Sequence, residues 1–373
     1  MESEILYRKL QQHLDRMPVG FPASPSAVEI RILRQLFTPE EAEIALELSA
    51  FPEPAAVIHK RLPGMALDGL TRLLEQMSAK GLILRLPSGK EFLYSKLIFA
   101  IGMYERQVHR LTAGLERDSR QYMQEAFGQA FHSKKTTQMR IVPVNQSIPV
   151  ERNVATCDDL RAYVAACAGP FARMTCICRH GKDLLGEPCK QTSLRDNCLT
   201  IGPAAQWAVD YGIARFIGKE EMLGLLDAAD KEGLVLQPEN TENPCFVCCC
   251  CGCCCGVLTS AKRFPQPADY FRSNFYAEVD AEICQSCGAC EARCQMDAIR
   301  SENGASQVDR GLCIGCGLCL STCPSGALRM QTRERQNVPP RNTRALYLQL
   351  LQERYGSWGM AKLAARKMLG MKI

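Results

Sequence analysis

The first 100 residues carry two different patterns of apolar and polar positions. In the segments 38–48, 53–63 and 67–81, apolar residues return every three or four positions, which predicts three amphipathic helices. The runs LILRL and EFLYS flank the turn PSGK at 87–90, as the two strands of a β-hairpin would. The pattern therefore predicts three helices followed by a hairpin.

Local sequence signals support the first of these helices. Thr38 is followed by Pro39 and, three residues on, by Glu41. This arrangement predicts a capping box with proline at the first helical position. Three helices and a hairpin in this order resemble a winged helix, so residues 1–100 are expected to form a winged-helix-like domain.

The remaining 273 positions mix helical and strand patterns. Residues 101–150 predict a helical connector, and residues 151–277 predict a domain of short helices and strands. Residues 278–330 are rich in turns, and residues 331–373 form a tail with two helices after a double proline. The expected fold is therefore a multidomain α+β protein.

The number and position of the cysteines indicate what kind of chemistry the protein performs. The chain of 373 residues contains 22 cysteines, and none lies before position 157. The start, MESEILYRKLQQ, shows no export signal, and the longest apolar stretches are too short to span a bilayer. We therefore expect a cytoplasmic protein without a transmembrane segment. In that reducing compartment, clustered cysteines favour metal binding over disulfides.

The formal net charge of +5 indicates neither a nucleic-acid nor a membrane partner by itself, but the charges are unevenly distributed. Residues 278–330 carry four Lys/Arg against seven Asp/Glu, whereas residues 331–373 carry nine against two. An acidic segment therefore precedes a basic tail. Three alternatives are open for this tail: it packs on its own domain, it docks on an acidic partner, or it lies on a membrane surface.

The strongest motif occurs twice, as ICQSCGACEARCQ at 283–295 and CIGCGLCLSTCP at 313–324. Both follow the spacing C-x2-C-x2-C-x3-C. Three closely spaced cysteines reach three irons of a [4Fe–4S] cluster, and the fourth ligand arrives from elsewhere in the chain. The pair resembles the motifs of bacterial-type ferredoxins that hold two [4Fe–4S] clusters, so residues 278–330 are expected to form a ferredoxin-like dicluster domain.

This resemblance implies a crossed set of ligands, in which the fourth cysteine of each motif serves the other motif's cluster. One cluster would be held by Cys284, Cys287, Cys290 and Cys323. The other would be held by Cys313, Cys316, Cys319 and Cys294. Structural zinc is the alternative for paired cysteines, but two complete repeats favour clusters. The family usually has proline after the fourth cysteine; Pro324 conforms, whereas Gln295 does not.

A second concentration of cysteine lies in CFVCCCCGCCCG at 245–256. Neighbouring cysteines rarely reach disulfide geometry, and an apolar core gains nothing from oxidisable thiols, so soft-metal binding is favoured. With TCICRHG, EPCK and DNCL upstream, the pattern resembles that of cysteine-rich, winged-helix-containing ferredoxin-domain proteins of anaerobic microbes. The resemblance implies a cofactor-binding middle domain. Its candidate metal ligands are Cys176, Cys178, Cys189, Cys198, Cys245, Cys248, Cys249, Cys250, Cys251, Cys253, Cys254 and Cys255.

Neighbouring side chains of an extended strand point to opposite faces. This alternation predicts two sets of thiols, with Cys248, Cys250 and Cys253 on one side and Cys249, Cys251 and Cys254 on the other. Arg179 and His180 follow the CxC directly and are candidates to donate to cluster sulfurs, with a surface histidine as the alternative for His180. Cys157 and Cys167 are expected to be ordinary small core residues.

The favoured function is an iron–sulfur electron-transfer protein or subunit. It would relay single electrons between a donor and an acceptor protein through two [4Fe–4S] clusters and at least one further cluster. An oxygen-sensitive iron–sulfur reductase or reductive activator with an open-site middle cluster is the first alternative, so enzymatic activity stays open. No dinucleotide-binding or P-loop motif is visible. A dimer or a larger complex stays open as well.

A redox-sensing winged-helix transcription regulator is the second alternative. DNA binding requires a clearly basic face, and residues 1–150 carry 19 Lys/Arg against 16 Asp/Glu. This balance is weak for a DNA reader, so we expect no nucleic-acid partner.

Overall fold

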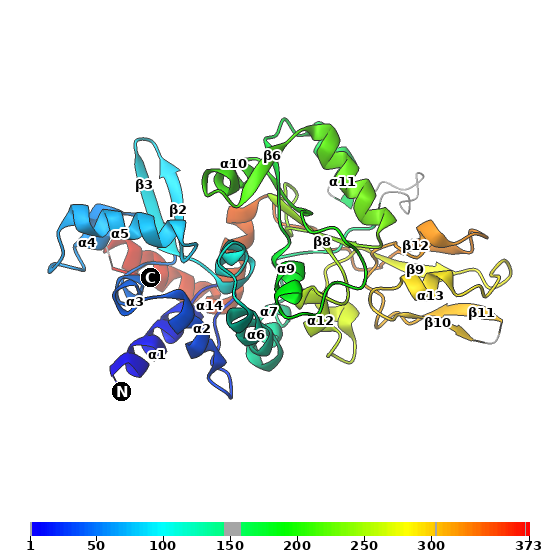
Figure 1. Ribbon diagram of the computed structural model, residues 1–373, viewed down its shortest axis with the longest axis horizontal. Coiled ribbons are helices and arrows are strands. Elements are labelled where there is room, and N and C mark those ends of the chain that lie inside the picture. The colour runs from blue at the N-terminus through cyan, green and yellow to red at the C-terminus, as the bar shows by residue number, and fades with distance from the viewer. Residues whose placement is uncertain (1, 145–157, 303, 370) are drawn as a thin grey trace. The chain divides into compact units, whose positions relative to one another are not determined.

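The computed structural model describes residues 2–144, 158–302, 304–369 and 371–373. The described chain divides into two compact units (Figure 1). The first unit contains residues 1–135 and 347–373, and the second contains residues 136–346. Helices and strands are mixed in both, as expected for an α+β protein. None of the helices in the described ranges is both long and apolar enough to cross a membrane.

The first unit begins with several helices and a small sheet, which the two helices nearest to it in sequence contact. Its first helices are α1 (Glu2–Asp15), α2 (Val28–Leu36), α3 (Pro39–Leu46), α4 (Ala55–His59) and α5 (Leu67–Ala79). The sheet has the order β1–β3–β2, with β1 (Glu53–Pro54), β2 (Ile83–Ser88) and β3 (Glu91–Lys96) all antiparallel. The predicted hairpin is confirmed. So is the capping box, in which Thr38 accepts a hydrogen bond from the backbone of Glu41.

Further helical segments complete the first unit. They are η1 (Phe99–Met103), η2 (Glu105–Gln107), α6 (Ala113–Tyr122), η3 (Met123–Phe127), α7 (Gly128–His132) and α14 (Thr343–Met368), which belongs to this unit from Tyr347 on. The α14 helix is broken at Gly356, where φ is 63°. After it, Lys372 forms an ion pair with Glu47 at 2.7 Å. The end of the basic tail therefore packs on the N-terminal helices.

The middle of the second unit is a five-stranded antiparallel sheet of order β6–β4–β5–β8–β7. Its strands are β4 (Phe171–Met174), β5 (Cys198–Ile201), β6 (Ala214–Ile217), β7 (Val235–Pro238) and β8 (Phe246–Cys250). The accompanying helices are α8 (Leu160–Ala166), α9 (Ile177–Leu184), α10 (Pro203–Asp210), α11 (Lys219–Lys231) and α12 (Gly256–Ala261). Cys248, Cys249 and Cys250 of the cysteine run thus lie in an inner strand, between β5 and β7.

The second unit ends with two antiparallel strand pairs. Strand β9 (Phe275–Val279), reached through η6 (Pro267–Tyr270), pairs with β12 (Leu328–Thr332), and β10 (Ile299–Glu302) pairs with β11 (Ala305–Val308). Each cysteine motif includes one short helical turn, namely α13 (Ala289–Arg293) in the first and η7 (Leu320–Thr322) in the second. Figure 1 shows α13 beside the β10–β11 hairpin, and the two also contact each other. The pairing of β9 with β12 brings the beginning and the end of the segment 275–332 side by side.

Candidate metal centres

The eight cysteines of the repeated motif surround two separate cavities. The first-motif cavity has about 300 Å³ of space, and its thiols are those of Cys284, Cys287, Cys290 and Cys323. The second-motif cavity has about 360 Å³, and its thiols are those of Cys294, Cys313, Cys316 and Cys319. The fold therefore brings the fourth cysteine of each motif to the first three cysteines of the other.

Backbone N–H groups of the neighbouring strands point at these sulfurs. Ser306 donates to the Sγ of Cys284 at 3.3 Å, and Ala277 donates to the Sγ of Cys313 at 3.5 Å. Such donors stabilise the negative charge of thiolates and of a cluster bound by them. Four thiols around each cavity, with main-chain donors beside them, fit the ligand requirements of a [4Fe–4S] cluster.

The cysteines that line the two cavities differ in their exposure. Cys287 is exposed, and main-chain N–H groups of Ser306 and Ser286 lower the pKa of the neighbouring Cys284 thiol. In the second-motif cavity Cys313 is buried, and burial raises the pKa of Cys316 to about 12. The first-motif cavity therefore has one exposed ligand, whereas the four ligands of the second are all buried or half-buried.

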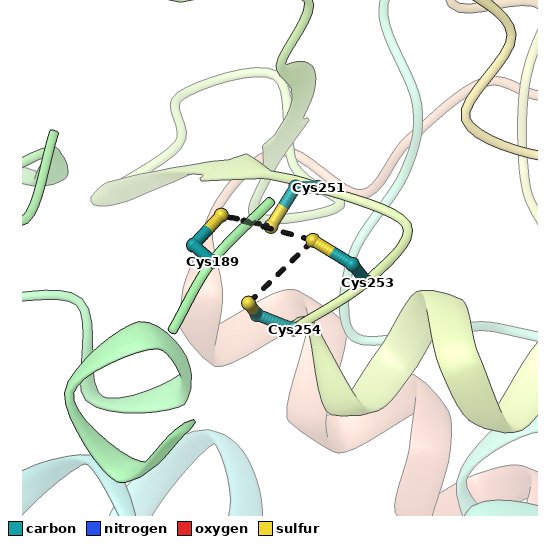
Figure 2. Close-up of side chains that lie close together, drawn as sticks. All are labelled: Cys189, Cys251, Cys253 and Cys254. Carbon is teal, nitrogen blue, oxygen red and sulfur yellow. Dashed lines mark hydrogen bonds between the residues drawn. The ribbon is translucent and has the colours of Figure 1, made fainter. Parts of the chain in front are cut away.

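Four cysteines of the middle region form a compact four-thiol group: Cys189, Cys251, Cys253 and Cys254. All four sulfur atoms lie within 4.8 Å of one another. Figure 2 shows the thiols converging, with three of them on the turn that follows β8 and Cys189 on a separate segment. The Cys189 Sγ lies 3.6 Å from that of Cys251 and 3.7 Å from that of Cys253. This is the one such group of three or more potential metal ligands within the described ranges.

Six other cysteines form a more extended six-thiol group. Neighbouring thiols are in contact along the series Cys198, Cys248, Cys250, Cys255, Cys178 and Cys176. At one end of the series, the Sγ atoms of Cys198 in β5 and Cys248 in β8 are 4.0 Å apart. No three of these six sulfurs lie mutually within 4.8 Å. The group is therefore a chain of thiols rather than a compact site.

Arg179 lies close to thiols of both groups, including Cys176 and Cys251, and is only 1% exposed. Its guanidinium donates to the side-chain oxygen of Asn197 and to the main-chain carbonyl of Cys249, while its Nε has no hydrogen-bond partner within the described structure. The groups that act most strongly on its charge are cysteine thiols, and no carboxylate of the described residues is among them. Because an uncompensated buried charge is costly, the surrounding thiols are its available source of negative charge.

The structure does not bring every predicted site residue into these groups. Cys245 is half-buried and accepts a hydrogen bond from the Thr343 hydroxyl at 3.7 Å. Cys249 is buried but belongs to neither group. His180 is half-buried, and its ring makes no hydrogen bond to any residue that the structure describes. Cys167 is half-buried beside Tyr163, and Cys157 lies outside the described residues.

The predicted alternation of the cysteine run holds only as far as β8 extends. Cys248 and Cys250 share the six-thiol group, as the strand geometry requires. Cys253 was expected with them, but it joins Cys251 and Cys254 instead. The reason is that β8 ends at Cys250 and the next residues form a turn, in which the two-residue period no longer applies.

A contact that sequence patterns did not reveal joins the cysteine run to the second motif. Gly252 donates its backbone N–H to the side-chain oxygen of Gln295 at 2.7 Å. The amide nitrogen of Gln295 donates in turn to Gln191 at 3.0 Å. The only sequence signal was the glutamine at a position where ferredoxins usually have proline. Since Gly252 follows Cys251 and Gln295 follows Cys294, the contact links the four-thiol group to the second-motif cavity.

Comparison with known proteins identifies one part of the chain. Residues 283–328 match the family model described as a 4Fe-4S dicluster domain. No curated protein matches the chain. The match and the cysteine groups indicate an iron–sulfur protein with a ferredoxin-type domain and an electron-transfer role.

Proposed function

We propose that the protein relays single electrons between a donor and an acceptor protein. The relay uses a [4Fe–4S] cluster at each of the two motif cavities and at least one further iron–sulfur cluster in the middle region. One observation carries the proposal: two cavities, each surrounded by four thiols, lie in the segment that matches a dicluster domain. Clusters bound there supply one-electron oxidation and reduction.

The difference in exposure supports a direction for the relay. The exposed Cys287 makes the first-motif cavity the side at which a redox partner approaches. The buried Cys313 and Cys319 make the second-motif cavity an internal position, shielded from solvent. Shielding lowers the local dielectric and excludes side reactions, which suits an intermediate station between two partners.

The contact between Gln295 and Gly252 supports transfer from the second-motif cavity to the middle region. Gln295 is only 7% exposed, and its side chain bridges Gly252 and Gln191. Gln295 directly follows Cys294 of the second motif. On the other side of the contact, Gly252 directly follows Cys251 and Gln191 lies two residues after Cys189. The glutamine therefore holds the ferredoxin-type domain against the cysteine run at a fixed distance.

The six-thiol group is the favoured position of the further cluster. Its chain of thiols is too extended for a single ion, and six thiolates exceed the ligand number of one [4Fe–4S] cluster. Arg179 supplies a buried positive charge beside it, which favours a cofactor of net negative charge. In this proposal Arg179 acts on the redox potential, while the half-buried His180 has no such role.

The first unit is proposed to be a docking module. The order of α3, β1, α4, α5 and the β2–β3 hairpin, with β1 paired to β3, supports the winged-helix interpretation. The weak positive charge of residues 1–150 favours a protein partner over DNA.

Metal and sulfide analysis of anaerobically purified protein tests the proposal. We expect clearly more than about eight irons per chain, which is the content of two four-iron clusters. Cys248→Ala should lose only the surplus iron and keep the ferredoxin-type EPR signals of the reduced protein. Cys245→Ala is the matched control, because Cys245 lies in neither thiol group. About eight irons in the parent protein, with the 245–255 cysteines fully alkylated, would contradict the middle cluster.

A further inference from the structure

The sulfur–sulfur distances of the four-thiol group are those of ligands around one metal ion. Zinc binds thiolates at about 2.3 Å, and tetrahedral geometry then places the sulfurs about 3.8 Å apart. In the structure, the Cys189–Cys251, Cys189–Cys253 and Cys253–Cys254 sulfur pairs are 3.6, 3.7 and 3.6 Å apart. All remaining pairs of the four are within 4.8 Å. Four thiols at this spacing enclose a position for a single ion.

The ferredoxin-type cavities provide an internal comparison. A [4Fe–4S] cluster bonds each thiolate to a different iron, so its ligands stand apart around a cavity. Cys294, Cys313, Cys316 and Cys319 do so around about 360 Å³ of space, and no three of their sulfurs lie mutually within 4.8 Å. The four-thiol group has the opposite arrangement, with its sulfurs in contact. One chain therefore contains two distinct kinds of cysteine site.

Local structure holds the four thiols in this arrangement. Three of them lie on the turn between β8 and α12, where the backbone of Gly252 approaches that of Gln295 too closely for a side chain. The fourth, Cys189, comes from the segment between α9 and β5. The backbone N–H of Lys190 donates to the Cys253 sulfur, and that of Cys254 donates to the Cys251 sulfur. Such donors stabilise metal-bound thiolates.

We propose that Cys189, Cys251, Cys253 and Cys254 bind a single divalent metal ion, Zn²⁺, in a closed tetrahedral site distinct from the iron–sulfur clusters. Four protein ligands leave no open position, which is typical of structural rather than catalytic zinc. Zinc also binds a given thiolate set more tightly than ferrous iron does. The ion joins the segment around Cys189 to the cysteine run and so fixes the turn that meets Gln295. This inference does not depend on the electron-relay proposal.

Zinc, iron and sulfide are measured together in the full chain, purified anaerobically without chelators. The expected result is one zinc per chain in the parent protein. Cys189→Ser should lose this zinc while the iron and sulfide contents and the ferredoxin-type EPR signals stay unchanged. Cys245→Ser should keep it, because Cys245 lies outside the group. Unchanged EPR signals also show that the variant has folded around its clusters.

Cobalt exchange into the parent protein provides a second measurement that needs no variant. Co²⁺ should produce the intense visible and near-ultraviolet absorption of a tetrahedral tetrathiolate complex, and one equivalent of Zn²⁺ should abolish it. Absence of zinc together with loss of iron and sulfide from Cys189→Ser would overturn the proposal in favour of a cluster. A single high-spin ferric ion in place of zinc would also overturn the assignment, because the site would then be a mononuclear iron centre.

Discussion

Replacing Gly252 by alanine adds a methyl group where two backbone segments meet. A Cβ atom at this position would lie 2.3 Å from the carbonyl oxygen of Gln295 and 3.2 Å from its carbonyl carbon. The obstacle is main chain on both sides, so a side-chain rotation cannot relieve it. The turn after β8 and the segment after Cys294 must therefore move apart.

The expected cost follows from this geometry. Real Cβ atoms essentially never approach another heavy atom closer than 3.0 Å, so the two backbones must separate by at least 0.7 Å. Inserting a methyl group into close-packed structure typically costs about 1–3 kcal/mol. Stretching the 2.7 Å hydrogen bond from Gly252 to Gln295 adds roughly 0.5–1.5 kcal/mol. We therefore expect the free energy of opening this contact to fall by about 1.5–4.5 kcal/mol.

Hydrogen exchange measured by mass spectrometry under anaerobic conditions reports that opening peptide by peptide. Peptides covering 245–256 and 290–300 should exchange faster in Gly252→Ala, while peptides from the first unit should be unchanged. Gly224→Ala is the matched control, since Gly224 lies within α11 and a Cβ there meets nothing within 4 Å. It should stabilise its helix by about 0.5–1 kcal/mol.

The reasoning would be refuted if Gly252→Ala protected these peptides as well as the parent protein does. Such a result would mean that the cysteine run and the second motif are not in contact. Equal loss of protection throughout both units would instead show a general folding defect, and the local contact would not be the cause.

Two further predictions concern the cluster ligands and the first unit. Cys323→Ala should disturb the EPR signal of the first-motif cluster, and Cys294→Ala should disturb that of the second-motif cluster. If each variant instead disturbed the cluster of its own motif, the two motifs would be self-contained sites. Burial, together with the positive charges of neighbouring basic groups, lowers the pKa of Lys96 to about 7. Between pH 7 and 10.5 the unfolded chain therefore binds this proton more than the folded one does. The free energy of unfolding should rise with pH across this range by roughly 5 kcal/mol from this group. Denaturant titrations at several pH values in this range measure the free energy of unfolding, and in Lys96→Met its rise with pH should be absent. If the variant showed the same pH dependence as the parent protein, the buried amine would not be its cause.

The sequence alone was most informative where the chemistry is local. The capping box at Thr38 and the β2–β3 hairpin depend on residues within a few positions of each other, and both are present. The spacing of Cys284, Cys287 and Cys290 also lies within seven residues. The match of residues 283–328 to a dicluster domain agrees with this part of the prediction.

The sequence was less informative about the cysteine run. Strand alternation correctly predicted that Cys248 and Cys250 lie on the same side, but it did not predict the change of direction after β8 that places Cys253 elsewhere. Nothing in the local pattern marked Gly252 as a point of close backbone approach, because its neighbour Gln295 is 43 residues away. The fold likewise decided that Cys245 and Cys249 stand outside both thiol groups.

Residue type and spacing determined that this chain has thiolate chemistry, because only cysteine supplies so many soft ligands in so short a segment. Which thiols act together was decided by tertiary structure. Cys189 meets Cys251 across 62 residues, and Cys198 meets Cys248 across 50, through the pairing of β5 with β8. Ligand sets are defined by distances of a few ångströms between sulfur atoms. A chain fixes such distances only after its strands have paired and its turns have closed.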